Sequence, residues 1–292
     1  MTESKYSARI TLGQNNYGKS EIRLVKVFRE ADGRHRIRDV WVDVSQEGDF
    51  SAAHTAGDNT GLMATDTMRN SVYALAKDRF TASLEEFGVE LVRYFVGAAP
   101  RAERVRVTLT EHPWERISAA GRPHDHSFVR SAGVRTASVA GDGSAFSVKA
   151  GIDDLTVLKT TNSGWRGFHH DRFTTLPETD DRILSTVLRA DWSYGTRTDL
   201  RFDELHAAVR EKILESFTDH YSPSVQNTLY RMGGAVLDEF AAVQEIHLSL
   251  PNRHHIPYDL DRFGLENENE VFHAAAEPYG LIEGTITRGP EQ

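Results

Sequence analysis

The segment EIRLVKVFREADGRHRIRDVWVDV, residues 21–44, contains two runs rich in β-branched and aromatic residues on either side of an Asp-Gly pair. In the second run Val40, Val42 and Val44 alternate with polar or outward-facing neighbours, which is the period of a strand with one buried face. Because Asp-Gly favours the backbone conformation of a tight turn, the segment predicts a β-hairpin.

Two amphipathic helices are expected after this hairpin. The spacing of Met68, Val72 and Leu75 predicts the first helix. Residues 82–97 carry an apolar stripe at helical spacing, and a Ser and a Glu three residues apart precede it as in a capping box. Period-two runs at residues 103–117 and 133–160 then predict strands, with a Gly-Asp-Gly turn inside the second run.

The second half of the chain repeats this order. Residues 146–161 and 182–194 predict strands, residues 203–217 and 222–240 predict helices, and residues 243–252 and 280–288 predict further strands. The pattern predicts two tandem α+β units, residues 1–146 and 147–292, each with an antiparallel sheet and helices on one face. A cyclic oligomer whose sheets join into a barrel would pair the sheet edges.

Composition narrows the classes of function. The 292 residues are 39% hydrophobic and 26% charged and include no cysteine, so disulfides, thiolate nucleophiles and iron–sulfur sites are excluded. The net charge of −9 argues against binding along a nucleic-acid backbone. No long apolar run predicts a membrane span, and neither a signal peptide nor a C-terminal Ser-Lys-Leu is found, so a cytoplasmic protein is expected.

Familiar catalytic motifs are missing. The thirteen histidines form no HExxH pattern, and RPHDHS at residues 122–127 is expected to be an exposed loop, so no metal site is predicted. The stretch GQNNYGKS at residues 13–20 fits the P-loop pattern but precedes a predicted strand, where a P-loop has a helix. No GxSxG nucleophile motif is present.

What remains is a scattered set of polar residues at the ends of predicted elements. Lys19 precedes a strand, Thr65 and Asp66 cap the first long helix, and Arg182 begins a strand. Gln226 opens the helix that begins SPSVQN, and Asn252 and His254 end a strand. Taken singly, each is typical of an ordinary exposed side chain.

Taken together, the segments around these residues resemble the urate oxidase (uricase) family. NNYGKSEIRLVKV resembles its YGK motif, and NTGLMATDTMRNSVYALAKD resembles the start of its first long helix. The stretch LTVLKTTNSGWRGFHHDRFTTLPETDDRILST resembles its central signature. SVQNTLYRM and SLPNRHHIPYDL match two further motifs, and all five lie in the family's order from about residue 10 to the end of the chain.

The resemblance implies a tunnelling fold (T-fold), with two units per chain and a homotetramer that encloses a tunnel. Active sites would lie at the subunit interfaces. It also implies oxidation of urate by O2 and water to 5-hydroxyisourate and hydrogen peroxide in purine catabolism, with no metal or organic cofactor.

The resemblance also implies roles for individual residues. Arg182 and Gln226 would clamp the purine edge, and the backbone of Val225 would add a donor. Trp165 stands where the family usually has a stacking Phe, and Asn252 would hold O2, water or peroxide above the ring. Lys19, Thr65 and His254 would form a proton relay. Asp66 would contact the purine through its backbone, and the neighbouring subunit would donate Thr65 and Asp66.

Two other functions stay open at this point. A pterin aldolase or synthase of the same fold would be expected to anchor its ring with an acidic residue, and the synthases use a site of three histidines. A non-catalytic purine-binding or structural oligomer would not need the relay of Lys19, Thr65 and His254.

Overall fold

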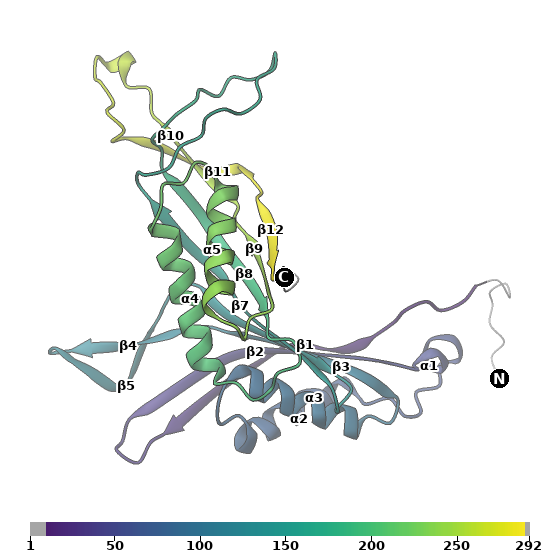
Figure 1. Cartoon of the computed structure of the whole chain (residues 1–292). Helices are drawn as coiled ribbons and strands as arrows, with labels where there is room; N and C mark the ends of the chain where they lie inside the picture. Colours follow the sequence, from purple (N-terminus) through teal and green to yellow (C-terminus); the bar gives the residue numbers. More distant parts are fainter. Residues whose placement is uncertain (1–9, 290–292) are drawn as a thin grey trace. The chain divides into compact units, whose positions relative to one another are not determined.

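The computed structural model describes residues 10–289 and divides them into two compact units (Figure 1). The described part of the first unit extends to Ala150 and includes Tyr194–Leu205. The second unit contains Gly151–Ser193 and the chain from His206 onward. The chain ends on which the cytoplasmic expectation rests, residues 1–9 and 290–292, lie outside the described residues.

The first unit is built on antiparallel strands. They are β1 (Tyr17–Arg29), β2 (His35–Gly48), β3 (Ala102–Glu111), β6 (Val134–Gly141) and the first part of β7 (Phe146–Lys159). The predicted hairpin is confirmed, since β1 pairs antiparallel with β2 and Leu24 lies opposite Val40. Val40, Val42 and Val44 are buried, as their period-two spacing predicted.

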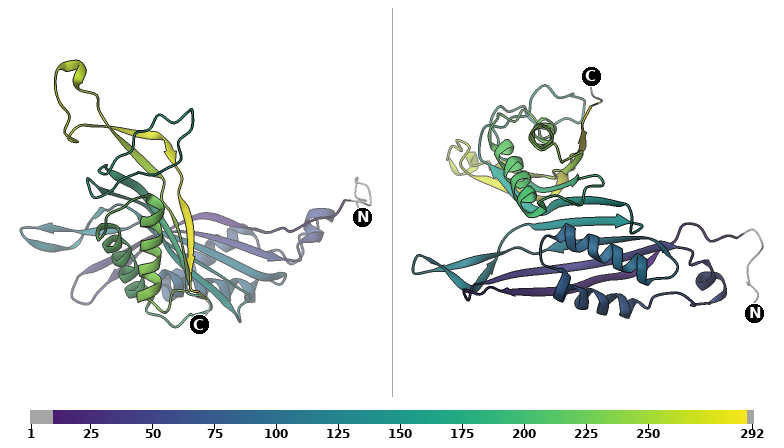
Figure 2. Two further views of the ribbon diagram at one scale, coloured as in Figure 1. Left: turned by 45° about the horizontal axis from the view of Figure 1, so that its top comes forward. Right: turned by 60° about the horizontal axis from the view of Figure 1, so that its bottom comes forward.

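Helices cover one face of this sheet (Figure 2). They are α2 (Thr65–Arg79) and α3 (Leu84–Ala98), preceded by the short α1 (Ser51–Ala56). The predicted capping box is present, because the Ser83 hydroxyl accepts from the Glu86 amide and the Glu86 side chain accepts from the Ser83 amide. Both helices bury their apolar stripe against the strands.

The second unit repeats the plan. Its strands are the rest of β7, β8 (Leu184–Ser193), β9 (Glu245–Ser249), β10 (Asn252–Pro257), β11 (Phe272–Gly280) and β12 (Glu283–Thr287). β8 pairs antiparallel with β9 and with β10, β9 pairs with β12, and β10 pairs with β11. A 3₁₀ turn, η1 (Asp261–Phe263), lies in the connection between β10 and β11.

The helices of the second unit are α4 (Phe202–Thr218) and α5 (Val225–Glu239). Gly233 in α5 lies where a Cβ would come within 2.6 Å of Ile286 and 3.1 Å of Leu248. Gly88 in α3 has the same kind of position, because a Cβ there would come within 2.7 Å of Val139. Each glycine therefore lets the second helix of its unit approach the sheet closely, whereas helix propensity alone marks Gly233 as a weak point.

A separate two-stranded ribbon, β4 (Trp114–Ala119) and β5 (Arg122–Arg130), lies in the first unit. The expected exposed loop at residues 122–127 is therefore wrong, because these residues form part of β5. Arg116 explains the difference, since its guanidinium donates to the carbonyls of His124, Asp125 and His35, each at 2.6 Å. The first two bonds join β4 to β5, and the bond to His35 attaches the ribbon to the start of β2.

A network of charges crosses the first unit. Arg135 binds Glu85 at 2.7 Å and Asp203 at 2.6 Å, and Arg38 binds Asp203 at 2.5 Å and Glu111 at 2.8 Å. Glu85 is fully buried, and burial raises the pKa of its carboxyl while Arg135 opposes that rise. Removing one partner of such a network leaves a buried charge without its counter-ion, which is strongly destabilising.

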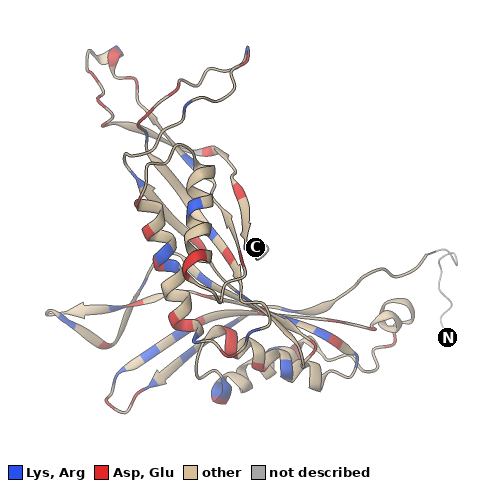
Figure 3. Ribbon diagram, viewed as in Figure 1, with Lys and Arg blue, Asp and Glu red and all other residues tan. Residues whose placement is uncertain are grey.

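Acidic and basic residues are interspersed along the helices of both units (Figure 3). Within residues 10–289, no helix is long and apolar enough to cross a membrane.

Candidate active site

Backbone hydrogen bonds join three distant segments in the second unit. The amide of Ser222 donates to Asn162, and the amide of Gly164 donates back to Ser222, both at 2.9 Å. The amide of Trp165 donates to Thr179 at 2.7 Å, and that of Arg182 donates to Ser163 at 2.9 Å. The segments 162–165, 179–182 and 220–222 therefore lie side by side, and the third leads directly into α5.

The first turn of α5 presents free backbone donors beside these segments. Ser224 is the N-cap, and its hydroxyl accepts from the amide of Asn227. The amides of Val225 and Gln226 precede Asn227 and have no partner within the helix, because the first N–H groups of a helix lack an intrahelical acceptor. The helix dipole adds partial positive charge at this end, so the turn favours an anion.

Arg182 brings a full positive charge to the same place. No ion pair to an acidic side chain is recorded for Arg182 within residues 10–289, and its Nε is buried without a hydrogen-bond partner. Burial lowers the pKa of the guanidinium, and Tyr221 opposes this in part. Its Cζ lies 5.8 Å from the centroid of the Trp165 ring. A half-buried cation without a counter-ion favours an anionic ligand.

Arg182 does not begin a strand, as was expected, but lies two residues before β8. Its position depends on the backbone bond to Ser163 and not on the sheet. Trp165 is half-buried and stacks on Phe168, with ring centroids 5.5 Å apart and planes at 12°. The loop therefore presents an aromatic face next to the guanidinium.

Asn252 and His254 lie at the start of β10, not at the end of a strand as was expected. Asn252 is 8% exposed and lies opposite Thr186 of β8. Because Thr186 follows the alternation of buried residues along β8, the Asn252 side chain lies on the helix-covered face. His254, two residues on, is half-buried.

The predicted residues of the first unit form a second group. Lys19 lies within β1, not before it, opposite Val44 of β2. Cross-strand partners share a face of the sheet, so Lys19 faces the helices, as buried Val44 does. Tyr17, on the same face, accepts a hydrogen bond from the amide of Met63 at 2.9 Å. This bond attaches the segment before α2 to β1 two residues from Lys19.

Thr65 and Asp66 are the first two residues of α2, and both are exposed. The expectation that they cap this helix is wrong, because Ala64 is the N-cap and no side chain caps it. The Asp66 carboxylate is bound by Arg69 at 2.6 Å and by Asn70 at 3.0 Å. Its backbone amide, in the first turn of the helix, stays available to a ligand.

The two groups have complementary chemistry. The second unit combines a guanidinium, an aromatic face, helix N–H groups and a side-chain amide, which suits a flat anion with polar edges. The first unit combines an amine and a hydroxyl, which suit proton transfer.

Comparisons with known proteins show the family of the chain. A family model described as Uricase matches residues 15–139 and 148–283. The chain belongs to the uricase family. A uricase of Arthrobacter globiformis is 46% identical to it, over 98% of this chain and 93% of that protein. A uricase of Dictyostelium discoideum is 38% identical, over 95% and 98% of the two chains.

Solved structures of uricases share the fold. The crystal structure of the Arthrobacter globiformis uricase has a TM-score of 0.92 and 45% identity, with 98% of this chain and 97% of that chain covered. A urate oxidase structure from Bacillus sp. TB-90 has a TM-score of 0.80 at 21% identity and so shows the fold alone. The α+β class with two repeated units, predicted from the sequence, is thus confirmed for this member of the uricase family.

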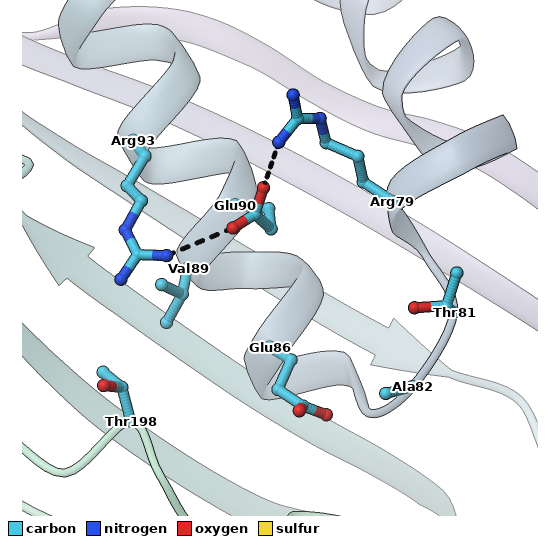
Figure 4. Close-up of a pocket in the computed structure, with 8 residues that line it drawn as sticks. All are labelled: Arg79, Thr81, Ala82, Glu86, Val89, Glu90, Arg93 and Thr198. Atoms are coloured by element: carbon cyan, nitrogen blue, oxygen red, sulfur yellow. Dashed lines mark hydrogen bonds and ion pairs between the residues drawn. The ribbon is translucent and has the colours of Figure 1, made fainter.

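A separate surface hollow of about 350 Å³ contains none of the predicted site residues (Figure 4). It lies in the first unit between the end of α2 and the start of α3, where Glu90 binds both Arg79 at 2.7 Å and Arg93 at 3.1 Å. Glu86 also lines the hollow, so two carboxylates balance two guanidiniums there. This balance gives the hollow no preference for an anion.

Within the described residues, no group of three or more His, Asp and Glu side chains is arranged to hold a metal ion. Two residues that position the candidate groups were not predicted from the sequence: Tyr17 in the first unit and Ser222 in the second. Tyr17 belongs to the YGK motif, which is its only sequence signal. Ser222 has none, because its role depends on backbone bonds to residues about 60 positions away.

Proposed function

We propose that this protein is a urate oxidase, which converts urate, O2 and water to 5-hydroxyisourate and hydrogen peroxide without a metal or organic cofactor. The observation that carries the proposal is Arg182, a half-buried cation with no acidic partner among the described residues, next to an aromatic face and the start of α5. Membership of the uricase family supports the same substrate.

Binding would use the second unit. The Arg182 guanidinium donates two parallel hydrogen bonds to a carbonyl edge of the urate anion and offsets its charge. The Gln226 amide offers a donor and an acceptor to the neighbouring edge, and the Val225 N–H adds a third contact. The Trp165 ring stacks on the flat heterocycle and excludes water from one face.

Oxidation needs the electron-rich urate dianion, because singlet urate and triplet O2 react only if electrons pass one at a time. Lys19 and Thr65 remove a proton from bound urate, with the hydroxyl passing it to the amine. Asn252 holds O2, and later water, over the ring with its amide. His254 completes the relay when water adds at C5 and peroxide leaves.

The two groups of residues would meet at a subunit interface. Thr65 and Asp66 of one copy would contact urate held by Arg182 and Gln226 of another, in a homotetramer whose sheets surround a tunnel. The exposed positions of Thr65, Asp66 and Gln226 support this arrangement, because side chains that complete a site in a second copy must be accessible in one chain.

The test follows urate absorbance and peroxide release together in chelator-treated protein. One peroxide formed per urate consumed, with no metal added, is the expected result. Binding of urate without turnover would favour the purine-binding oligomer, and turnover only after metal addition would overturn the cofactor-free reaction. Turnover of a reduced pterin, with urate untouched, would point to the pterin enzymes of the same fold.

A further inference from the structure

A polar cluster, here the His220 cluster, joins the first residues of α5 to the segment that precedes the helix. It consists of His220, Ser222 and Thr228. The Thr228 hydroxyl donates to the Ser222 hydroxyl at 2.7 Å, and His220 Nε2 lies 3.1 Å from Thr228 Oγ1 and 3.3 Å from Ser222 Oγ. Ser222 is 0% exposed and Thr228 is 1% exposed. None of the three is a predicted contact of urate.

The direction of these hydrogen bonds follows from the imidazole. Burial lowers the pKa of His220, and Lys159 lowers it further, so the ring is neutral at pH 7. Because the Thr228 hydroxyl donates to Ser222, the single hydrogen of the Ser222 hydroxyl is left to donate to Nε2 of the neutral ring.

The His220 cluster holds two parts of the candidate site together. Ser222 bonds Asn162 and Gly164 through its backbone, so its position sets that of Trp165, the next residue after Gly164. Thr228 lies in the second turn of α5, and its hydroxyl also lies 3.2 Å from the carbonyl of Ser224, the N-cap. The side-chain bond from Thr228 to Ser222 therefore connects α5 to the loop that carries the aromatic face.

A second set of bonds supports the same point from outside the helix. The Lys159 ammonium donates to the His220 carbonyl at 2.9 Å, and the Asn162 side chain donates to the same carbonyl at 3.1 Å. Two side chains therefore fix the position of the His220 carbonyl. Several hydrogen bonds that converge on one segment restrict its conformation more than a single bond does.

We propose that His220, Ser222 and Thr228 form a positioning group that fixes the Val225 amide and Gln226 of α5 against Trp165 and Arg182. This inference rests on the proposed function, since the ligand so positioned is urate. The group does not touch the ligand. Its effect should appear mainly in substrate binding, because it sets the distance between contacts on opposite sides of the ring.

The test replaces Thr228 with Val, which keeps the shape and removes the hydroxyl. Thr285→Val is the matched control, because the Thr285 hydroxyl also bonds a histidine, His247, at 2.9 Å, but this bond is exposed to solvent and joins β9 to β12. We expect T228V to raise KM about 3- to 10-fold, the loss of one buried hydrogen bond, with a smaller change in kcat. T228S should restore KM, and T285V should leave it unchanged.

Anaerobic titration with urate gives the dissociation constant without turnover, and it should rise by the same factor in T228V. Equal KM values in T228V and T285V, or a lower thermal midpoint in T228V with unchanged urate affinity, would overturn the positioning role. If T228V does not fold, Ser222→Ala removes the acceptor instead and is judged by the same criteria. Failure of the unmodified protein to bind or oxidise urate would instead sink the proposed function.

Discussion

Replacing Arg182 with Met should have opposite effects on substrate binding and on the stability of the free protein. Arg182→Met keeps an unbranched apolar stem and removes the charged guanidinium. The guanidinium should make charge-assisted bonds to urate worth about 1.5–3 kcal/mol. Truncating a fully buried charged partner costs about 3–5 kcal/mol, and Arg182 is only half-buried. A loss of about 2–3 kcal/mol, or roughly 30- to 150-fold in affinity, is therefore expected.

The free protein should respond in the other direction. Without a ligand, Arg182 has a buried Nε with no hydrogen-bond partner, so the native state bears an uncompensated desolvation cost. A Met at this position should leave the thermal midpoint unchanged or raise it by about 1–2 °C, the effect of about 1 kcal/mol in a chain of this size. Added urate, which should stabilise the unmodified protein, should no longer do so.

The assay combines anaerobic urate titration, steady-state urate depletion and thermal unfolding with and without urate. Arg189→Met is the control, because Arg189 lies on β8 in the same unit but is exposed and bonds Asp191 at 2.9 Å. An R182M protein with normal urate affinity, and a midpoint several degrees lower, would show that Arg182 is a structural residue and would refute its assignment to the site.

Lys19→Met should lower kcat roughly 10²- to 10⁴-fold, because the general base is lost. Native mass spectrometry should show the same assembly as for the unmodified protein. An unchanged kcat would show that Lys19 is not part of the relay. Gly233→Ala should lower the free energy of unfolding by about 1–3 kcal/mol, because a Cβ would come within 2.6 Å of Ile286. Gly234→Ala, where a Cβ would meet nothing within 4 Å, should raise it by about 0.5–1 kcal/mol. Equal shifts of the denaturant midpoint in the two variants would contradict this explanation. Bonds from the turn between β6 and β7 lower the pKa of Asp142 to about 2, so the native state holds its proton less tightly than the unfolded chain. The stabilisation is therefore complete above the unfolded value of 3.8 and is lost as pH falls towards about 2, and the difference in thermal midpoint between Asp142→Ala and the unmodified protein should shrink over that range.

Local patterns predicted most of the helices and strands because the signals lie within a few residues of one another. The hairpin of β1 and β2, the stripe of α3 and its capping box depend only on alternation, helical spacing and cap chemistry. The predicted strand at residues 103–117 is two strands, β3 and the start of β4, and the pairing of β4 with β5 was not predicted because none of the ribbon's residues is fully buried. Its stability depends on bonds from Arg116 to carbonyls, one of them 81 residues away in sequence.

The sequence predicted which residues belong to the candidate site but not how they are arranged in space. Arg182 and Gln226 were predicted through the family resemblance, but no periodicity relates residue 163 to residue 222, whose bridge brings their segments together. Backbone hydrogen bonds of this kind make few demands on side-chain type. Sequence patterns therefore identify which helices and strands are present, and the structure shows where they end and which of their ends meet.

The segment Tyr194–Leu205 means that the two halves of this chain cannot be separated by one cut. A fragment ending near residue 146 would lose Asp203, and with it the carboxylate shared by Arg38 and Arg135. Arg38 would keep Glu111 and Arg135 would keep Glu85, but the carboxylate that bridges the two ion pairs would be missing. A fusion, circular permutation or pair of complementing fragments that separates the two units must therefore keep the twelve residues Tyr194–Leu205 with the N-terminal unit.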